Sequence, residues 1–310
     1  MRMSDQEIGE HLRAGAELIE HTLGGLAESV PSLSAMAKVP ALATLGRAEQ
    51  YSLMAGGKRI RPVLALETCR MLGGRDDAVL LPACALEMVH TYSLIHDDLP
   101  CMDNDDLRRG KPTNHKVFGE AIAVLAGDGL LTDAFSVLAT SPGLPAETGL
   151  HAVRVLADAA GSNGMVGGQV VDLESEGRTI SPETMQALHD RKTGCLMIAA
   201  VRLGALAAGV LPSEDEDGAW TRLTTYAAKI GRAFQVVDDL LDVTSSEKQL
   251  GKTPGKDREE HKNTYLSFYT VGQARQYAEE LTEQACRAVA PYDTDGILCG
   301  IARYLAKRDH

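Results

Sequence analysis

The chain has 310 residues, of which 43 are acidic and 31 basic, so its formal net charge is −12. Its 44% of hydrophobic residues is too many for a disordered chain and enough to bury a large core. The acidic balance argues against nucleic acid as a partner, because nucleic-acid phosphates require a basic surface. It is compatible with a compact anionic substrate, since a few cations or bound metal ions can reverse the field at one site.

The sequence pattern is that of an all-α protein. Ala, Leu, Glu, Arg and Met dominate, and apolar residues recur at helical spacing between Ile8 and Leu23. The same spacing predicts helices over residues 41–55, 62–72, 78–99, 117–140, 145–160, 182–211, 219–243 and 271–290. Ser181 is expected to cap the helix that begins with Pro182. No segment has the size of an interdomain linker, so we expect a single domain over residues 1–310.

Cysteine usage and hydropathy predict a soluble protein of the cytoplasm. The six cysteines form no C-x-x-C pair, so neither a disulfide framework nor a zinc site is expected. The first residues lack the apolar region of a signal peptide. The longest apolar stretch, residues 196–211, falls short of the ~20 residues that a membrane span requires.

A first cluster of carboxylates follows the apolar helix predicted over residues 78–99. Its members are Asp97, Asp98, Asp103, Asp105 and Asp106, and the cations Arg108, Arg109 and Lys111 come directly after them. Pro100 should end or bend the helix, so Asp103 would reach the same site through a bulge.

A second cluster, Asp238, Asp239 and Asp242, interrupts another apolar helical run. Asp238 and Asp242 lie four residues apart on one helix face and could reach the same cation. Carboxylates crowded at the end of an apolar helix repel one another unless something neutralises them. Mg²⁺ suits this role, because it prefers oxygen ligands from carboxylates and substrate phosphates.

Basic and polar groups accompany both clusters. Gly56 and Gly57 allow close backbone approach, and Lys58 and Arg61 behind them suit a phosphate group, although the spacing is not that of a P-loop. His90 lies two helical turns before Asp97. Further polar residues within or beside apolar segments are Gln169, Asp172, Lys192, Lys252, Lys256 and Lys262.

Five segments together resemble the trans-isoprenyl diphosphate synthases of the polyprenyl synthetase family. In chain order they are residues 56–62, 96–120, 192–194, 234–242 and 251–257. The resemblance extends over residues 45–265. Four residues separate Asp98 from Asp103, which is similar to the bacterial and plant farnesyl and geranylgeranyl diphosphate synthases and most like the bacterial farnesyl type.

The resemblance implies an all-α, single-domain helical bundle around a deep central cavity, assembled as a homodimer. The aspartates matching those that hold three Mg²⁺ ions on an allylic diphosphate are Asp97, Asp98, Asp103, Asp238, Asp239 and Asp242. Residues matching the allylic diphosphate site are Arg108, Lys192, Lys252 and Lys262, with Lys256 as a neighbouring candidate. Those matching the isopentenyl diphosphate site are Lys58, Arg61, His90 and Arg109. Those implied beside the reacting carbons are Lys192, Thr193, Gln235 and Gln169.

The implied reaction is a Mg²⁺-dependent head-to-tail condensation of isopentenyl diphosphate with dimethylallyl or geranyl diphosphate. Metal ions and cations would stabilise the departing diphosphate, and the cavity would hold the allylic carbocation beside the isopentenyl double bond. The released diphosphate can accept the proton that is lost, so no strong general base is required.

Product length depends on what closes the cavity below Asp97. In the family, an aromatic residue five positions upstream acts as a floor and accompanies a C15 product; here that residue is Tyr92. Helical geometry alone puts Tyr92 roughly 140° away from Asp97, and Ser93 is more nearly below it. The C15 product, farnesyl diphosphate, therefore rests on the resemblance. Geranylgeranyl diphosphate, the C20 product, and an ordinary packing role for Tyr92 stay open.

Two other functions fit part of the pattern. A terpene cyclase also ionises an allylic diphosphate, but it needs only one diphosphate site. The two groups of cations in this chain indicate two diphosphate sites. A non-catalytic subunit that modulates a true synthase would be expected to lose metal-binding aspartates, and this chain keeps both clusters.

Overall fold

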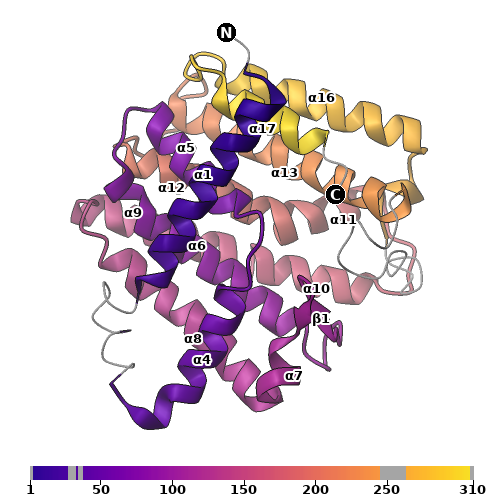
Figure 1. The fold of residues 1–310 in the computed structure, drawn as a ribbon. Coiled ribbons are helices and arrows are strands. Elements are labelled where there is room, and N and C mark those ends of the chain that lie inside the picture. The colour runs from indigo at the N-terminus through magenta and orange to yellow at the C-terminus, as the bar shows by residue number, and fades with distance from the viewer. Residues whose placement is uncertain (1–2, 27–32, 34–37, 245–262, 308–310) are drawn as a thin grey trace.

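The computed structural model describes residues 3–26, 33, 38–244 and 263–307. The α-helices of this part of the chain are α1 (Asp5–Gly24), α4 (Ala43–Leu53), α5 (Ile60–Met71), α6 (Asp76–Asp97), α7 (Asn114–Phe118), α8 (Glu120–Ala139), α9 (Ala146–Ala160), α10 (Met165–Ser175), α11 (Pro182–His189), α12 (Cys195–Ala207), α13 (Ala219–Thr244), α16 (Val271–Val289) and α17 (Ile297–Ala306). The shorter elements are the 3₁₀ turns η1 (Pro40–Leu42) and η3 (Tyr265–Ser267), the π-helical turn η2 (Asp190–Gly194), and the antiparallel strands β1 (Leu107–Arg108) and β2 (Lys111–Pro112). Figure 1 shows the helices arranged as a bundle around α6.

The structure confirms the all-α fold class and most of the predicted helices. The Ser181 hydroxyl accepts a hydrogen bond of 3.2 Å from the Thr184 amide and caps α11, as expected. The prediction was wrong over residues 117–140, because Gly119, at φ +84°, separates α7 from α8. The predicted helix over 182–211 is likewise interrupted, by the π-helical turn η2. Helices α10 and α17 were not predicted.

Helix α6 is the centre of the core. It packs against α1, α5, α8 and α12, which surround it in Figure 1. Most of its side chains are apolar, and Val79, Leu86 and Val89 have no exposed surface. A helix of this kind is stable only when it is enclosed. The end that carries Asp97 is consequently fixed by packing along the whole length of α6.

Two of the described helices, α6 and α8, are long and apolar enough to cross a membrane by length and composition alone. A buried core helix passes the same test, and 72% of the apolar stretch of α6 is buried inside the structure. The corresponding share for α8 is 39%, so this helix presents an apolar face at the surface.

A buried ion pair anchors the loop before α5. Arg59 adopts a left-handed conformation, at φ +48°, and its guanidinium donates to Glu87 Oε1 at 2.6 Å and to the Leu53 carbonyl at 2.7 Å. The side chain of Arg59 has no exposed surface and that of Glu87 only 2%. The left-handed turn directs the neighbouring Lys58 outward, where it is exposed. The position of the cationic loop therefore depends on a carboxylate inside the core.

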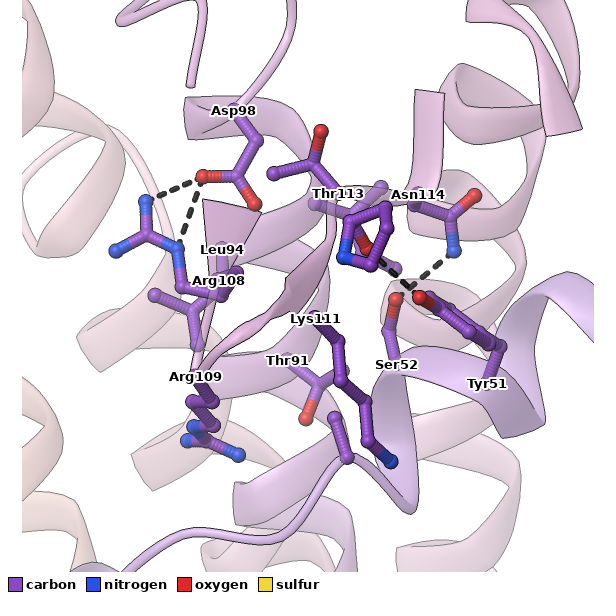
Figure 2. A pocket seen from close by; sticks show the side chains of 13 residues that line it. Tyr51, Ser52, Thr91, Leu94, Asp98, Arg108, Arg109, Lys111, Thr113 and Asn114 are labelled. Carbon is purple, nitrogen blue, oxygen red and sulfur yellow. Dashed lines mark hydrogen bonds and ion pairs between the residues drawn. The ribbon is translucent and has the colours of Figure 1, made fainter. Parts of the chain in front are cut away.

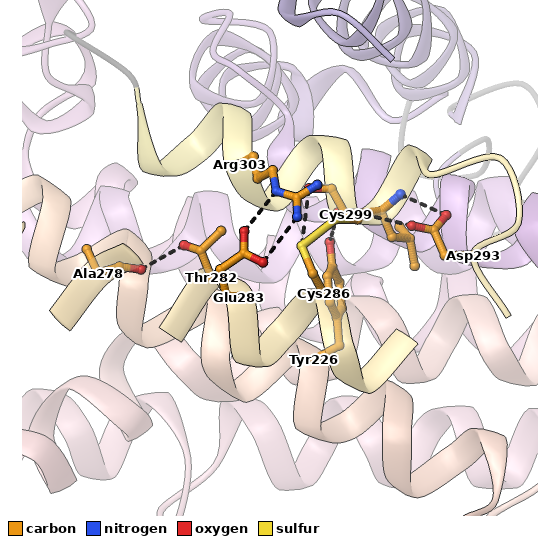
Figure 3. Close-up of a disulfide and its surroundings, with 9 residues drawn as sticks. Tyr226, Ala278, Thr282, Glu283, Cys286, Asp293, Cys299 and Arg303 are labelled. Carbon is orange, nitrogen blue, oxygen red and sulfur yellow. Dashed lines mark hydrogen bonds and ion pairs between the residues drawn. A yellow bond between two sulfur atoms is a disulfide. The ribbon is translucent and has the colours of Figure 1, made fainter. Parts of the chain in front are cut away.

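Cys286 and Cys299 form a disulfide between α16 and α17, which Figure 3 shows beside Asp293 and Tyr226. The expectation that the cysteines form no disulfide is wrong for this pair. The two residues are 13 apart in the sequence, and the turn between the helices brings their Cα atoms to 4.8 Å. Asp293 fixes this turn by accepting hydrogen bonds from the amides of Leu298 and Cys299 at 3.2 and 2.8 Å.

Replacing Glu87 with Leu should lower the free energy of unfolding by about 3–5 kcal/mol, because it leaves the buried Arg59 charge with only the partly exposed Glu20 carboxylate, at 3.4 Å, as an ionic partner. Urea unfolding followed by circular dichroism measures this loss. The control is Asp77→Ala, which breaks the exposed Arg75–Asp77 ion pair and should cost less than about 1 kcal/mol. Equal losses in the two variants would contradict the anchoring role of Glu87.

Replacing both Cys286 and Cys299 with Ala should lower the free energy of unfolding by about 2–4 kcal/mol, because the disulfide restricts the unfolded chain. Unfolding of the wild type with and without a dithiol reductant should show a loss of similar size. The double variant serves as control, since its stability should not respond to the reductant. A wild type that is also insensitive would refute the contribution of this disulfide.

Candidate active site

About half of the predicted site residues line a cavity of about 550 Å³ at the C-terminal part of α6. Apolar side chains of α8, α10 and α12, such as Val124, Val170 and Leu196, form much of its wall. The polar residues that line it are Arg61, His90, Ser93, His96, Asp97, Gln169, Lys192 and Thr193. The cavity therefore joins an apolar chamber to a polar end, as an amphipathic anion requires.

The first aspartate cluster turns back on itself at the end of α6. The helix ends at Asp97, and the amide of Asp103 donates to the Asp97 carbonyl at 2.9 Å. Asn104, at φ +49°, completes the turn. Burial, together with the negative charges of Asp103 and Asp98, raises the pKa of Asp97 to about 6. The helix ends before Pro100, and the turn that follows brings Asp103 back toward Asp97.

Asp98 and Arg108 bind each other. The guanidinium of Arg108 donates to Asp98 Oδ1 through Nε, at 2.9 Å, and through Nη2; Nη2 also contacts Asp105 at 3.3 Å. Figure 2 shows Arg108 reaching back toward Asp98 from the strand that carries it. In the sequence analysis Asp98 was assigned to metal and Arg108 to diphosphate, and here each is the partner of the other.

The π-helical turn η2 places Lys192 and Thr193 on the cavity wall. Lys192 Nζ lies 2.5 Å from Asp172 of α10, and its positive charge also acts on Asp97. The Thr193 hydroxyl donates to Gln235 Oε1 of α13 at 3.1 Å. Gln169 lies on the same wall. All four residues predicted beside the reacting carbons are thus close to one another at the cavity.

Asp190 braces the π-helical turn, a role that no sequence pattern indicated. Its two carboxylate oxygens each accept a hydrogen bond of 2.7 Å from Arg232 of α13. A π-helical turn inside a helix is rare and is found mainly at functional sites. The pair Asp190–Arg232 ties this turn to α13 and so holds Lys192 and Thr193 in place.

The second aspartate cluster lies on α13. The charge of Asp238 acts on Arg61, whose side chain lines the cavity. Asp239 is buried, with 4% of its surface exposed, and its oxygens accept hydrogen bonds from Gln235, at 3.0 Å, and from the Tyr265 amide, at 2.7 Å. Asp242 is half-buried. Asp239 thus joins α13 to η3, while Asp238 is the member of this cluster that interacts with a cavity residue.

Two of the residues assigned to isopentenyl diphosphate, Arg61 and His90, meet on the wall of the same cavity. Arg61 Nη1 lies 3.4 Å from His90 Nε2, and Arg61 Nε is buried without a hydrogen-bond partner in the described chain. Burial and the charges of Arg61 and Arg109 hold the pKa of His90 well below its usual value. Arg109 donates to the Gly56 carbonyl and packs against Gly57, where a Cβ would lie 2.7 Å from its guanidinium carbon. The two glycines therefore accommodate Arg109.

Tyr92 and Ser93 both line the cavity. Tyr92 is 5% exposed, and its ring meets that of His96 edge-on, with 5.7 Å between the ring centres. The helical wheel placed Ser93 closer to the position below Asp97, but the tyrosine side chain is long enough to reach the same wall. Lys252, Lys256 and Lys262 lie outside the described residues.

Within the described part of the chain, no three His, Cys, Asp or Glu side chains come close enough together to form a metal-binding group. Mg²⁺ in phosphate-processing sites is usually held by one or two carboxylates, with substrate phosphates and water completing the shell. The half-buried Asp97 and Asp103, brought together by the turn after α6, are the oxygen donors that fit this kind of site.

Comparison with known proteins agrees with this geometry. The chain matches the family model described as Polyprenyl synthetase over residues 43–293. It is 49% identical over 273 residues to the farnesyl diphosphate synthase of Geobacillus stearothermophilus, covering 86% of this chain and 90% of that one. It is 47% identical over 264 residues to the geranylgeranyl diphosphate synthase of Cyanophora paradoxa, covering 84% of this chain and 86% of that one.

A solved structure shares the fold over nearly the whole chain. The apo structure of an FPP/GFPP synthase from Zymomonas mobilis aligns with a TM-score of 0.83 at 35% identity, covering 98% of this chain and 100% of that one. With the paired aspartate clusters, the π-helical turn and the cavity in place, these matches lead to one conclusion: the chain belongs to the polyprenyl synthetase family and is a prenyltransferase of isoprenoid synthesis.

Proposed function

We propose that the chain condenses isopentenyl diphosphate with dimethylallyl or geranyl diphosphate, head to tail, to give farnesyl diphosphate and diphosphate. The observation that carries the C15 product is the position of Tyr92, which is buried and lines the cavity on the same helix that ends in Asp97. An allylic chain growing away from Asp97 would meet this ring.

A C20 product, geranylgeranyl diphosphate, is the second candidate. The relatives include synthases of both products at nearly equal identity, 49% for the farnesyl and 47% for a geranylgeranyl enzyme. Ser93 also lines the cavity and offers little obstruction beside Tyr92. The product therefore depends on which of these two neighbouring side chains the growing chain meets.

We propose that Mg²⁺ ions, three in each site, are held by the carboxylates of both clusters. When bound, Mg²⁺ supplies Lewis-acid stabilisation of the departing diphosphate. Asp97 and Asp103 would hold the metal from α6 and its bulge, and Asp238 and Asp242 from α13. Asp98 and Asp239 would first have to exchange their present partners, Arg108 and the Tyr265 amide.

The chain's own residues would orient and protect the reacting groups. Lys192, next to Asp97, would hold the allylic diphosphate, together with Arg108 and the predicted Lys252 and Lys262. Thr193 and Gln235 present paired polar groups beside the reacting carbons, near Gln169. The apolar walls exclude water, which protects a carbocation.

A second anion site on the same cavity supports two diphosphate substrates. Arg61 has a buried Nε without a partner and could use it for a phosphate oxygen. Because His90 is neutral at pH 7, it can act as a hydrogen-bond partner without adding charge. Lys58 and Arg109 would complete this isopentenyl diphosphate site. A terpene cyclase needs only one such site, and isopentenyl diphosphate consumption measured with radiolabel separates the two activities.

We propose a homodimer that uses the exposed face of α8. Leu125 of α8 is 53% exposed, and Leu150 of α9 is 73% exposed. Apolar surface of this kind is typical of subunit interfaces. Sedimentation velocity tests the assembly. We also propose a cytoplasmic location: four of the six cysteines are free, although the Cys286–Cys299 disulfide is a bond that a reducing compartment disfavours.

Replacing Tyr92 with Ala should lengthen the product beyond C15, because it removes the floor of the cavity. Chromatography of the dephosphorylated products, with isopentenyl and geranyl diphosphate as substrates, measures the chain length. Ser93→Ala, at the neighbouring cavity position, serves as the matched control and should leave the product unchanged. An unchanged product in the Tyr92 variant, with activity retained, would show that Tyr92 is not the floor.

Removing Mg²⁺ with a chelator should weaken binding of geranyl diphosphate by about tenfold or more, equivalent to ~1.4 kcal/mol, because the aspartates then repel the diphosphate. Titration calorimetry with and without Mg²⁺ measures the change. Asp97→Asn should reduce the effect of Mg²⁺, whereas Asp106→Asn, an exposed member of the same loop, should not. Equal affinity in both conditions would be inconsistent with a metal bridge.

A purified chain that shows no turnover with Mg²⁺ and both substrates would indicate a non-catalytic subunit.

A further inference from the structure

A second cavity lies apart from the aspartate clusters, where α1, α4, α6 and α8 meet. It has a volume of about 300 Å³, within the range of small-molecule sites. Leu23, Leu53, Met88 and Leu130 contribute to its apolar wall, one from each of the four helices. None of its lining residues belongs to the cavity that holds Asp97.

A buried carboxyl group lines this apolar space. Glu49 of α4 is only 7% exposed, lines the cavity, and its Oε1 has no hydrogen-bond partner in the described chain. An unpaired buried carboxylate is costly, so a group of this kind calls for a partner. Gly129 of α8 makes room for it, because a Cβ at that position would lie 2.2 Å from Glu49 Oε1.

A second carboxyl group lines the same cavity. Asp133 lies one helical turn after Gly129 and is half-buried. Burial of Glu49, together with the negative charge of Asp133, raises the pKa of Glu49 to about 7. Burial also raises the pKa of Asp133. The cation in the lining, Arg47, donates instead to the Thr44 hydroxyl at 2.9 Å, and the described residues form no ion pair with either carboxyl.

We propose that this cavity is a binding site for an amphipathic cation, with an apolar body between the four helices and an ammonium group at Glu49 and Asp133. Such a ligand satisfies both features at once: the apolar wall is covered, and the two carboxyls gain a charge-assisted partner. A neutral amphiphile could donate a hydrogen bond but has no charge to offset the carboxylates, and an anionic one would be repelled by them. The site does not depend on the prenyl transfer proposed above.

The site shares structure with the cationic loop. Leu53, which lines the cavity, accepts the hydrogen bond from Arg59 through its carbonyl, and Met88 adjoins Glu87, the other partner of Arg59. A ligand here would therefore contact residues next to the anchor of that loop.

Titration calorimetry of the full chain without substrates tests the proposal, with octylammonium chloride as the probe and octanol and octanoate as comparisons, all below their micelle concentrations. Octylammonium should bind about tenfold or more tightly than either comparison. Glu49→Gln keeps the shape of the side chain and should remove this preference. Asp133→Asn, at a more exposed position that folding tolerates better, should reduce it as well.

Glu17→Gln, which removes an exposed carboxylate of α1 outside the cavity, is the control and should bind octylammonium like the wild type. Loss of preference in either cavity variant, with the control unchanged, supports the site. The proposal is overturned if octylammonium binds no more tightly than octanol, if both cavity variants retain the preference, or if Glu17→Gln loses it equally. Prenyl transfer is not measured here, so these outcomes are independent of the proposed function.

Discussion

The arrangement of the active site follows from placing carboxylates at the C-terminal end of a largely buried, mostly apolar helix. The helix dipole already makes that end of α6 negative, so Asp97 and Asp98 are destabilised both by it and by each other. Each is accordingly accompanied by a cation. Arg108 forms an ion pair with Asp98, and the positive charge of Lys192 acts on Asp97. The negative field that remains is suited to recruiting divalent ions.

The cations are themselves positioned by strained or unusual backbone. Arg59 and Arg109 have positive φ angles of 48° and 54°, and Lys192 sits on a π-helical turn. Such conformations persist only where the surroundings enforce them. Glu87 in the core binds Arg59, and the Gly56 carbonyl accepts a hydrogen bond from Arg109. The Asp190–Arg232 pair holds the turn that carries Lys192. The rigid core thus supports geometry that the local sequence would not adopt alone.

Much of this could be predicted from the sequence, because helices and their caps are local. The apolar spacing predicted α6 and α13, and the pattern Ser181–Pro182 predicted the start of α11. The aspartate clusters were visible as charge inside apolar segments. Pairings between distant elements were not predictable. The partner of Asp98 depends on the short hairpin β1–β2, and that of Asp190 depends on how α13 packs.

The burial of Glu49 is a second feature that could not be predicted from the sequence. In the sequence it is one glutamate in an amphipathic helix, and nothing local marks it as buried. Its burial depends on Gly129, eighty residues later, whose missing side chain provides the space for the carboxyl oxygen. Positions 49 and 129 are consequently coupled sterically. An alanine at 129 would require a shorter or differently directed side chain at 49, so substitutions at the two positions should arise together across descendants of this chain.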